Sequence, residues 1–326
     1  MKILKIFLIT SLLIGFSITK ANACACGCGV FNVGTSSLIP SCAGGTAFVQ
    51  YDYINQNQNW NNNDKAAAEN NTHQQVKTQT ITAGMQYMFN RKWGLALRVP
   101  YVNRDVKNSS LASEMSSSHA GHHHDEEETM VSGTNYLNQK SIGDIRINAI
   151  YSGLFDDMST GLTFGLKLPT GDYKYKGLDH RDLQIGTGST DSILGAYHFG
   201  QIDNKGKFNY FLQGSWQHAL TIKNNYRMGD EFAAALGTYY NAGSFLGIKR
   251  ISPILQITGS QRLKDRGINA NVENSGYTQI FFAPAIELNF SSFKIYTDIG
   301  FPIYRSVNGN QLVANKIYKL ILGYNF

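Results

Sequence analysis

The chain is organised by a two-residue alternation of apolar and polar side chains that recurs along most of its length. For example, Leu162, Phe164 and Leu166 alternate with Thr163 and Gly165. Such alternation places the two sets of side chains on opposite faces of a β-strand. Residues typical of turns separate the alternating segments. The pattern predicts twelve strands, at 45–54, 77–89, 93–106, 141–154, 159–172, 190–202, 207–220, 230–241, 248–264, 277–290, 293–306 and 315–326.

The predicted connections fall into two classes that alternate along the chain. The short ones are 90–92, 155–158, 203–206, 242–247 and 291–292. The longer or more polar ones are 55–76, 107–140, 173–189, 221–229, 265–276 and 307–314. Short turns at one end and long loops at the other are typical of outer-membrane barrels, whose tilted strands need about 9–11 residues to cross a bilayer.

These features predict an all-β fold, a twelve-stranded antiparallel transmembrane β-barrel of up-and-down topology with short periplasmic turns and long extracellular loops. A soluble β-sandwich would alternate as well, but it would normally use shorter strands. A closed barrel is the one sheet that leaves no unpaired backbone in lipid. The last predicted strand closes the barrel against the first, with its aromatic and apolar face toward lipid: Tyr318, Leu320, Leu322, Tyr324 and Phe326.

The N-terminal region indicates export. Lys2 and Lys5 precede an apolar run at 6–18, and Ala21-Asn22-Ala23 matches a small-x-small cleavage site. We therefore predict a signal peptide at 1–23, a Cys-rich periplasmic or lumenal segment at 24–44 and the barrel at 45–326. The expected location is the outer membrane of a Gram-negative bacterium.

Composition and charge narrow the function classes. The chain has 32 Gly, 18 Tyr and 18 Phe but only 6 Pro, and its formal charge is +6. Removing the three lysines of the predicted signal peptide lowers that charge to +3. A net charge this small does not indicate the strongly basic surface that nucleic-acid binding needs, so nucleic acid is excluded as a partner.

Two stretches carry a family resemblance, Ser141 to Tyr173 and Asp182 to Phe199. The matching elements are Gly143-Asp144, the run GLKLPTG from Gly165 to Gly171, and Gly186-Thr187-Gly188-Ser189-x-Asp191. The pattern resembles the meta-pathway phenol-degradation family of outer-membrane barrels, a group allied to porin-like and fatty-acid-channel-like transporters. The resemblance implies a barrel for small hydrophobic or aromatic compounds and no catalytic motif. It gives the glycines and Pro169 structural roles in strand ends and turns.

The resemblance also bears on partners. The C-terminal Phe326, at the end of an alternating aromatic strand, resembles the signal read by the barrel assembly machinery. Outer-membrane lipid and this machinery are therefore expected partners, together with small solutes or metal ions.

Four cysteines lie close together after the predicted cleavage site: Cys24, Cys26, Cys28 and Cys42. In an exported protein such a group indicates two disulfides, with three connectivities open. Thiolates also bind copper(I) and zinc, although Cys-x-Cys spacing is short for a closed zinc site. Lipidation of Cys24 is a further alternative. The spacing leaves these interpretations open.

A second group of metal-ligating residues lies in the longest predicted loop. It consists of His119, His122, His123, His124, Asp125 and Glu126. Imidazole suits zinc, copper and nickel, and neighbouring carboxylates attract divalent cations. Zinc or copper is accordingly the candidate bound metal, and a solvated loop without a ligand is the alternative.

Charged residues on the inward face of the predicted strands form a third candidate set. They are Arg98, Asp144, Arg146, Lys167, Arg250, Arg262, Glu287, Lys294, Asp298 and Lys319. Facing lipid, a Lys or Arg would cost about 2–4 kcal/mol at the midplane. Their mixed signs suit a paired interior network as well as a selective pore. Twelve strands also enclose less space than the 16–18 strands of aqueous porins.

The sequence favours an outer-membrane channel or transporter-like barrel for small solutes, linked to transition-metal ions. The alternative is a barrel that conducts nothing and binds metal or serves a structural role. An outer-membrane hydrolase is a second alternative, since His198 and His218 lie in predicted strands. No G-x-S-x-G elbow occurs in the chain, and we expect no enzyme.

Overall fold

The computed structural model describes residues 40, 43–66, 75–108, 135–174 and 181–326. Within these ranges the regular secondary structure consists of β-strands and one 3₁₀ turn, η2 (Arg181–Leu183). No helix of the described ranges is long and apolar enough to span a bilayer. The strands are β1 (Gly44–Asn61), β2 (Asp64–Lys65), β3 (Gln75–Met88), β4 (Trp93–Asn108), β5 (Asn135–Ile142), β6 (Arg146–Tyr151), β7 (Thr160–Lys167), β8 (Asp191–Gln201), β9 (Phe208–Ala219), β10 (Glu231–Tyr240), β11 (Arg250–Arg262), β12 (Tyr277–Asn289), β13 (Phe293–Val307) and β14 (Asn310–Asn325).

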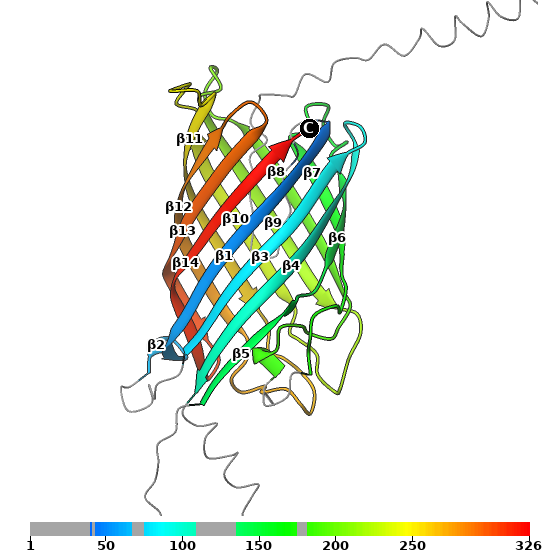
Figure 1. Ribbon diagram of the computed structural model, residues 1–326, viewed down its shortest axis with the longest axis vertical. Coiled ribbons are helices and arrows are strands. Elements are labelled where there is room, and N and C mark those ends of the chain that lie inside the picture. Colours follow the sequence, from blue (N-terminus) through cyan, green and yellow to red (C-terminus); the bar gives the residue numbers. More distant parts are fainter. Residues whose placement is uncertain (1–39, 41–42, 67–74, 109–134, 175–180) are drawn as a thin grey trace, which may run out of the picture.

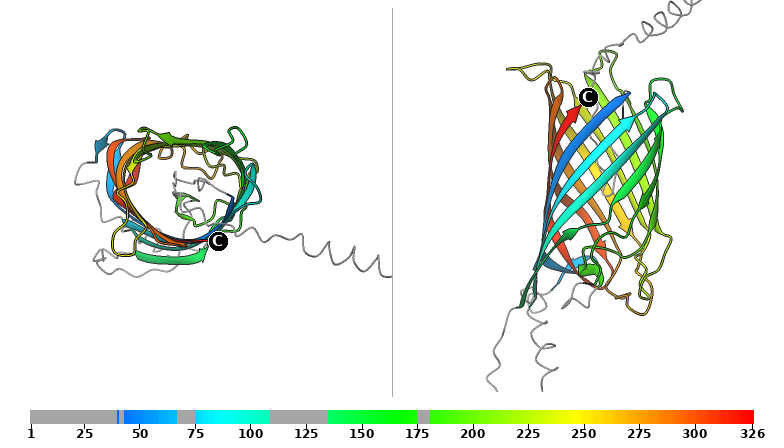
Figure 2. Two further views of the ribbon diagram at one scale, coloured as in Figure 1. Left: turned by 90° about the horizontal axis from the view of Figure 1, so that it is seen from above. Right: turned by 45° about the vertical axis from the view of Figure 1, so that its right-hand side comes forward.

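The strands form one closed antiparallel barrel (Figures 1 and 2). Consecutive strands pair, except β2 with β3 and β5 with β6, and β1 pairs with β14 from Thr46 opposite Asn325 to Asn61 opposite Asn310. Because β5 and β6 pair with successive parts of β4, and β2 is a two-residue addition to β1, the wall has twelve strand positions. The predicted twelve-stranded barrel is confirmed.

Several predicted boundaries were wrong. The predicted strand 141–154 is two strands, and β5 begins inside the predicted loop 107–140. The predicted loop 307–314 is only the turn Asn308-Gly309, so β13 and β14 continue through most of it. β1 extends past its predicted end to Asn61, and the extension from Asn55 is largely polar on both faces, so the apolar alternation fades while the backbone pairing continues. β7 ends at Lys167, before the predicted end at 172.

The wall is interrupted between β5 and β6, at residues 143–145. Pro100 of β4 lies opposite this interruption, and its carbonyl accepts a hydrogen bond of 2.8 Å from the Gly143 N–H. In an antiparallel strand the N–H and C=O of one residue face the same neighbour, and proline has no N–H to donate. The missing donor explains why regular pairing stops here.

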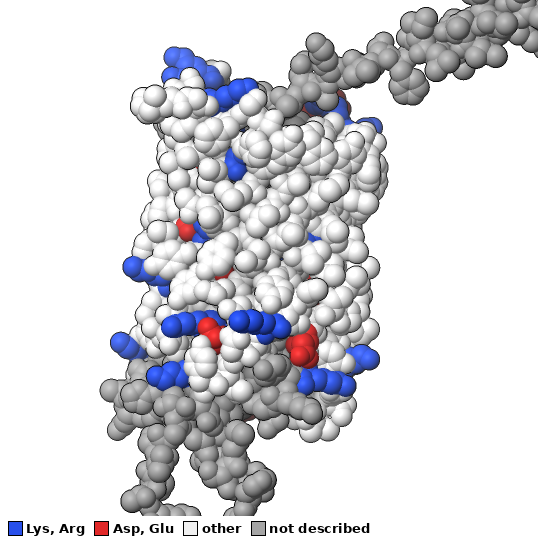
Figure 3. Space-filling view, in the orientation of Figure 1, with Lys and Arg blue, Asp and Glu red and all other residues white. Residues whose placement is uncertain are grey.

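The outer face of the barrel is apolar. Figure 3 shows a largely uncharged wall, with most of the charged side chains in view toward its lower end. Leu212 and Leu236, on neighbouring strands, are 52% and 54% exposed on this face. Aromatic pairs such as Trp93–Tyr151, with ring centroids 4.8 Å apart, lie near the end that carries the short turns. We call this the short-turn end, and the opposite end the loop end.

The interior of the short-turn half holds a buried apolar cluster. Its large members come from strands all around the barrel: Phe48, Met88, Ile150, Met158, Tyr197, Phe211, Ile254, Tyr296 and Ile321. Each is at most 4% exposed. We call these residues the apolar cluster. It is the hydrophobic core of the protein and lies where an aqueous porin would hold water.

Candidate functional site: the cavity inside the barrel

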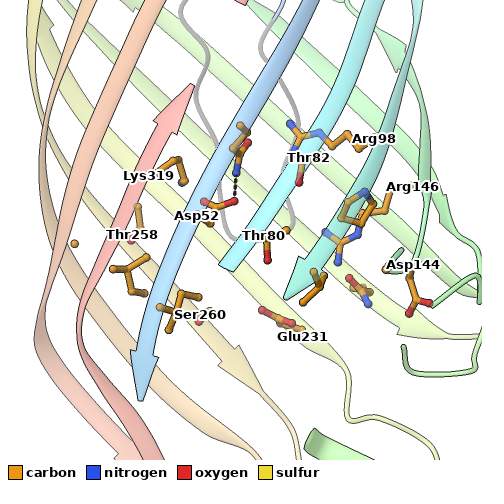
Figure 4. A pocket seen from close by; sticks show the side chains of 18 of the residues that line it. Asp52, Thr80, Thr82, Arg98, Asp144, Arg146, Glu231, Thr258, Ser260 and Lys319 are labelled. Atoms are coloured by element: carbon orange, nitrogen blue, oxygen red, sulfur yellow. Dashed lines mark hydrogen bonds between the residues drawn. The ribbon is translucent and has the colours of Figure 1, made fainter. Parts of the chain in front are cut away.

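A cavity of about 510 Å³ lies in the interior on the loop side of the apolar cluster. On β1 the cluster residue is Phe48, and the cavity is lined by Gln50, Asp52 and Ile54, further toward the loop end. Figure 4 shows side chains from several strands pointing into this space. The charged side chains that line it are Asp52, Arg98, Asp144, Arg146, Lys167, Glu231, Asp298 and Lys319.

Three cations stand side by side on one wall of the cavity. Arg98 of β4 is directly opposite Arg146 of β6, and Arg146 is directly opposite Lys167 of β7. Lys167 is in turn opposite Asp191 of β8. Cross-strand neighbours with like charge destabilise a sheet, and the carboxylates of Asp144 and Asp191 lie beside the Lys167 end of this row.

The interruption in the wall is held by the loop that follows β7. The Thr170 hydroxyl donates to the Gly143 carbonyl at 2.8 Å and accepts from the Ile145 N–H at 2.9 Å. The Gly171 N–H donates to Asp144 Oδ1 at 3.0 Å. Thr170 and Gly171, just beyond the end of β7, therefore hold residues 143–145 by side-chain hydrogen bonds from the β7 side.

Asp144 connects this interruption to the second half of the same loop. Its Oδ2 accepts hydrogen bonds from the Thr187 N–H at 3.1 Å and the Thr187 hydroxyl at 2.9 Å. The Lys167 ammonium lies 3.5 Å from the same carboxylate oxygen and donates to the Thr187 hydroxyl at 2.5 Å. Both charged side chains are buried, at 2% and 8% exposed for Lys167 and Asp144.

Asp191 completes this arrangement. Its Oδ2 lies 2.5 Å from Lys167 Nζ and accepts from the Gln217 amide at 2.6 Å, while its Oδ1 accepts from the Ser189 hydroxyl at 2.6 Å. We call Asp144, Lys167, Thr187, Ser189 and Asp191 the Lys167 cluster. Buried charges are tolerated when they are paired and hydrogen-bonded, as they are here.

The elements of the family resemblance meet in this cluster. Gly143-Asp144, the GLKLPTG run and the Gly186–Asp191 run each supply at least one of its residues. Gly171 and Gly186 pass so closely that a Cβ on Gly171 would lie 2.7 Å from the Gly186 Cα. Close backbone approach therefore explains both glycines.

A second series of hydrogen-bonded polar side chains lines the opposite side of the interior. The Gln256 amide donates to the Tyr296 hydroxyl at 2.8 Å, and that hydroxyl donates to Asp298 Oδ2 at 2.7 Å. The Lys319 ammonium lies 3.7 Å from the same oxygen. Asp52, directly opposite Lys319 on β1, accepts from the Gln50 amide at 2.7 Å (Figure 4).

The structure places the ten predicted lumen residues in two groups. Six line the cavity: Arg98, Asp144, Arg146, Lys167, Asp298 and Lys319. The other four do not line it. Arg250 and Glu287 lie 3.7 Å apart in the short-turn half, where Lys294 is also buried. Arg262 lies 3.9 Å from Asp265 at the loop end.

Sequence reasoning missed several residues of the cavity wall. Asp52 lies on the inward face of the first predicted strand, and Glu231 lies at the start of the eighth, so strict period-two counting would have found both. Thr187 and Asp191 belong to the resemblance pattern, which assigned them no role, and both contact Lys167. Their convergence on Lys167 depends on strand register.

The two strand histidines lie on the outer side of the wall, away from the cavity. His198 Nδ1 is 2.7 Å from the Thr160 hydroxyl, and its Nε2 is 2.9 Å from the Tyr210 hydroxyl. His218 Nδ1 is 2.8 Å from Asp230 Oδ2, and its Nε2 is 2.8 Å from an Arg227 nitrogen.

The predicted signal peptide and the predicted metal ligands lie outside the described residues. This applies to the four cysteines, Cys24, Cys26, Cys28 and Cys42, and to the loop residues His119, His122, His123, His124, Asp125 and Glu126. Among the residues that the structure does describe, no group of three or more His, Cys, Asp or Glu side chains could hold a metal ion.

No family model and no curated protein matches the sequence. Solved structures do resemble the fold. The COG4313 outer membrane channel from Pseudomonas putida F1 superposes with a TM-score of 0.63 at 14% identity, covering 90% of this chain and 98% of that one. Two further structures are less similar. The CymD monoaromatic hydrocarbon channel has a TM-score of 0.45 at 10% identity, covering 87% of this chain and 89% of that one. A Pseudomonas aeruginosa FadL homologue has a TM-score of 0.41 at 10% identity, covering 86% of this chain and 90% of that one. The first likeness shows that the two chains share a barrel fold.

Proposed function

We propose that this protein is an outer-membrane channel or transporter-like barrel that admits small solutes into its interior cavity. The observation that carries the proposal is the combination of a closed barrel, an apolar outer face and a polar cavity lined by charged side chains. An apolar band outside and a polar interior are what a membrane barrel requires. The shared fold with a structure described as an outer membrane channel supports the same conclusion.

The proposed path enters from the loop end. Outer-membrane barrels place their long loops outside the cell and their short turns in the periplasm. A solute would reach the charged cavity first and the apolar cluster next. Apolar constrictions can gate a pore by excluding water, so passage would require cluster side chains such as Phe211 and Tyr296 to separate.

A barrel that conducts nothing is the second candidate function. The apolar cluster favours it, because its side chains are packed and buried like an ordinary protein core. In such a barrel the cavity binds a solute without passing it on, or the charged side chains of its wall only stabilise loops such as the one after β7.

Planar-bilayer conductance of the purified full chain separates the two candidates. The channel proposal expects discrete conductance steps, and it expects larger steps for Phe211→Ala, which removes a buried ring from the interior. Leu212→Ala is the matched control, because the adjacent residue faces outward and is 52% exposed. If the wild type, Phe211→Ala and Leu212→Ala all fold and insert but none conducts, the result would favour the non-conducting barrel over the channel.

A further inference from the structure

Arg98 and Arg146 place two guanidinium groups together in the wall of the cavity. They are direct cross-strand neighbours that both line the cavity, and Arg98 is only 6% exposed. Opposed like charges destabilise a sheet, and burying a guanidinium adds a desolvation cost. Because both guanidinium groups line the cavity, they form together a positively charged part of its wall that can bind an anion.

The surroundings of Arg98 hold its guanidinium in place. Gly84, its neighbour on β3, carries no side chain, and the Phe48 ring packs over that glycine so closely that a Cβ there would strike it. The Arg98 guanidinium carbon lies 5.5 Å from the centre of the same ring. A cation over an aromatic face is stabilised and oriented, which prepares the group for a ligand.

The rest of the cavity wall suggests the body of that ligand. Pro100 and Val102 lie beside Arg98 along β4, and Phe281 and Ile317 line the cavity from other strands. Hydroxyl groups such as that of Ser260 also line it. A cavity whose wall combines charged groups with apolar side chains fits a small amphipathic molecule.

We propose that Arg98 and Arg146 bind the carboxylate of a small amphipathic organic anion, and that anions of this class are the solutes the cavity accepts. The planar guanidinium fork matches a carboxylate and can donate two parallel hydrogen bonds to it. The inference rests on the proposed function of the cavity as a solute site.

A purely structural role for the pair has its own support. Glu231, Asp144 and Asp191 attract the Arg146 charge, which therefore also balances the two carboxylates of the Lys167 cluster. In that case replacement of Arg146 would weaken folding without changing any preference among solutes. The test must therefore measure ligand discrimination as well as stability.

Isothermal titration of the detergent-solubilised full chain with benzoate and with benzyl alcohol provides that measurement. The two probes share an aromatic ring and differ in the carboxylate. The wild-type protein should bind benzoate at least about tenfold more tightly than the alcohol, since a hydrogen bond to a charged group is worth that much or more. Equal binding of both probes, or binding of neither, would overturn the inference without any variant being needed.

Variants locate the site. Arg98→Gln and Arg146→Gln should each remove most of the preference for benzoate, while Arg98→Lys and Arg146→Lys should retain part of it because charge remains and the planar fork is lost. Arg250→Gln is the control, because Arg250 does not line the cavity. A preference for benzoate that persists in a folded Arg98→Gln, Arg146→Gln double variant would also overturn the inference. The lysine variants keep the test valid if the glutamine variants fail to fold.

Uptake into proteoliposomes separates this inference from the proposed function. If both probes enter faster than into vesicles without protein, and at equal rates in wild type and variants, the barrel is a channel and the anion site is refuted. If neither enters while benzoate still binds in an Arg98- and Arg146-dependent manner, the anion site stands and the transport proposal fails.

Discussion

The Lys167 ammonium lies 2.5 Å from Asp191 Oδ2 and 3.5 Å from Asp144 Oδ2, in a place where none of the three side chains is more than 8% exposed. The three residues come from β7, from the start of β8 and from the interruption between β5 and β6. One buried cation therefore joins the interrupted wall, the loop after β7 and the strand that follows it.

Lys167→Met should strongly destabilise the barrel, because it leaves two buried carboxylates without their cation. Breaking a buried ion pair by removing one partner costs about 3–5 kcal/mol. The free energy of unfolding, measured with urea in lipid vesicles, checks this. Lys205→Met, at an exposed position in the turn between β8 and β9, should change it by less than about 0.5 kcal/mol. Equal effects of the two substitutions would show that the cluster does not hold the loop.

Gly186→Ala should destabilise the loop after β7. A Cβ at this position would run into the Gly171 backbone, which cannot move aside as a flexible side chain would. Overpacking of this kind costs about 1–3 kcal/mol. Gly214→Ala is the matched control, because its Cβ would have its nearest contact at 3.9 Å. Urea unfolding of both variants measures the difference, and a Gly186→Ala protein as stable as Gly214→Ala would refute the close approach.

Leu236→Arg tests whether the outer face of the wall meets lipid. Leu236 lies in the middle of β10 and is 54% exposed, and an arginine facing the bilayer midplane costs about 2–4 kcal/mol. Its folding into vesicles should therefore become less favourable by that amount. Leu246→Arg, in the turn between β10 and β11 where the side chain is 86% exposed, should fold like the wild type. An unchanged folding free energy for Leu236→Arg would argue for a water-facing wall.

Metal binding by the His-rich loop remains a prediction from the sequence. Isothermal titration should detect binding of zinc, copper or nickel to the wild-type protein. Changing His119, His122, His123 and His124 to alanine should abolish that binding, because the imidazoles would be the ligands. Alanine at Ser116, Ser117 and Ser118 in the same loop is the control and should leave binding unchanged. Identical isotherms for wild type and the histidine variant would remove the idea.

The barrel could be predicted from the sequence because its wall obeys one simple rule. On β7, for example, Leu162, Phe164 and Leu166 alternate with small or polar residues, and that alternation alone sets which face points outward. The rule fails where both faces are largely polar, as in the extension of β1 from Asn55, and where a single residue such as Pro100 interrupts pairing.

The candidate site could be predicted only in part, because period two gives the face of a residue but not its neighbours across the sheet. It places Arg98 and Arg146 inside, but it does not show that they are opposite each other. Likewise Asp144 and Asp191 are far apart in sequence, and only the register of β7 with β8 and the path of the loop bring both to Lys167. Register and loop path depend on the folded chain.

The most direct test of the membrane barrel is refolding of the mature polypeptide from urea, with and without phospholipid vesicles, followed by circular dichroism and analytical ultracentrifugation. We predict a folded β-barrel only when vesicles or detergent are present, because the exposed leucine, isoleucine and aromatic side chains of the wall need an apolar surrounding. Folded, monodisperse protein in plain buffer would contradict this prediction, and the proposed transport function would fall with it.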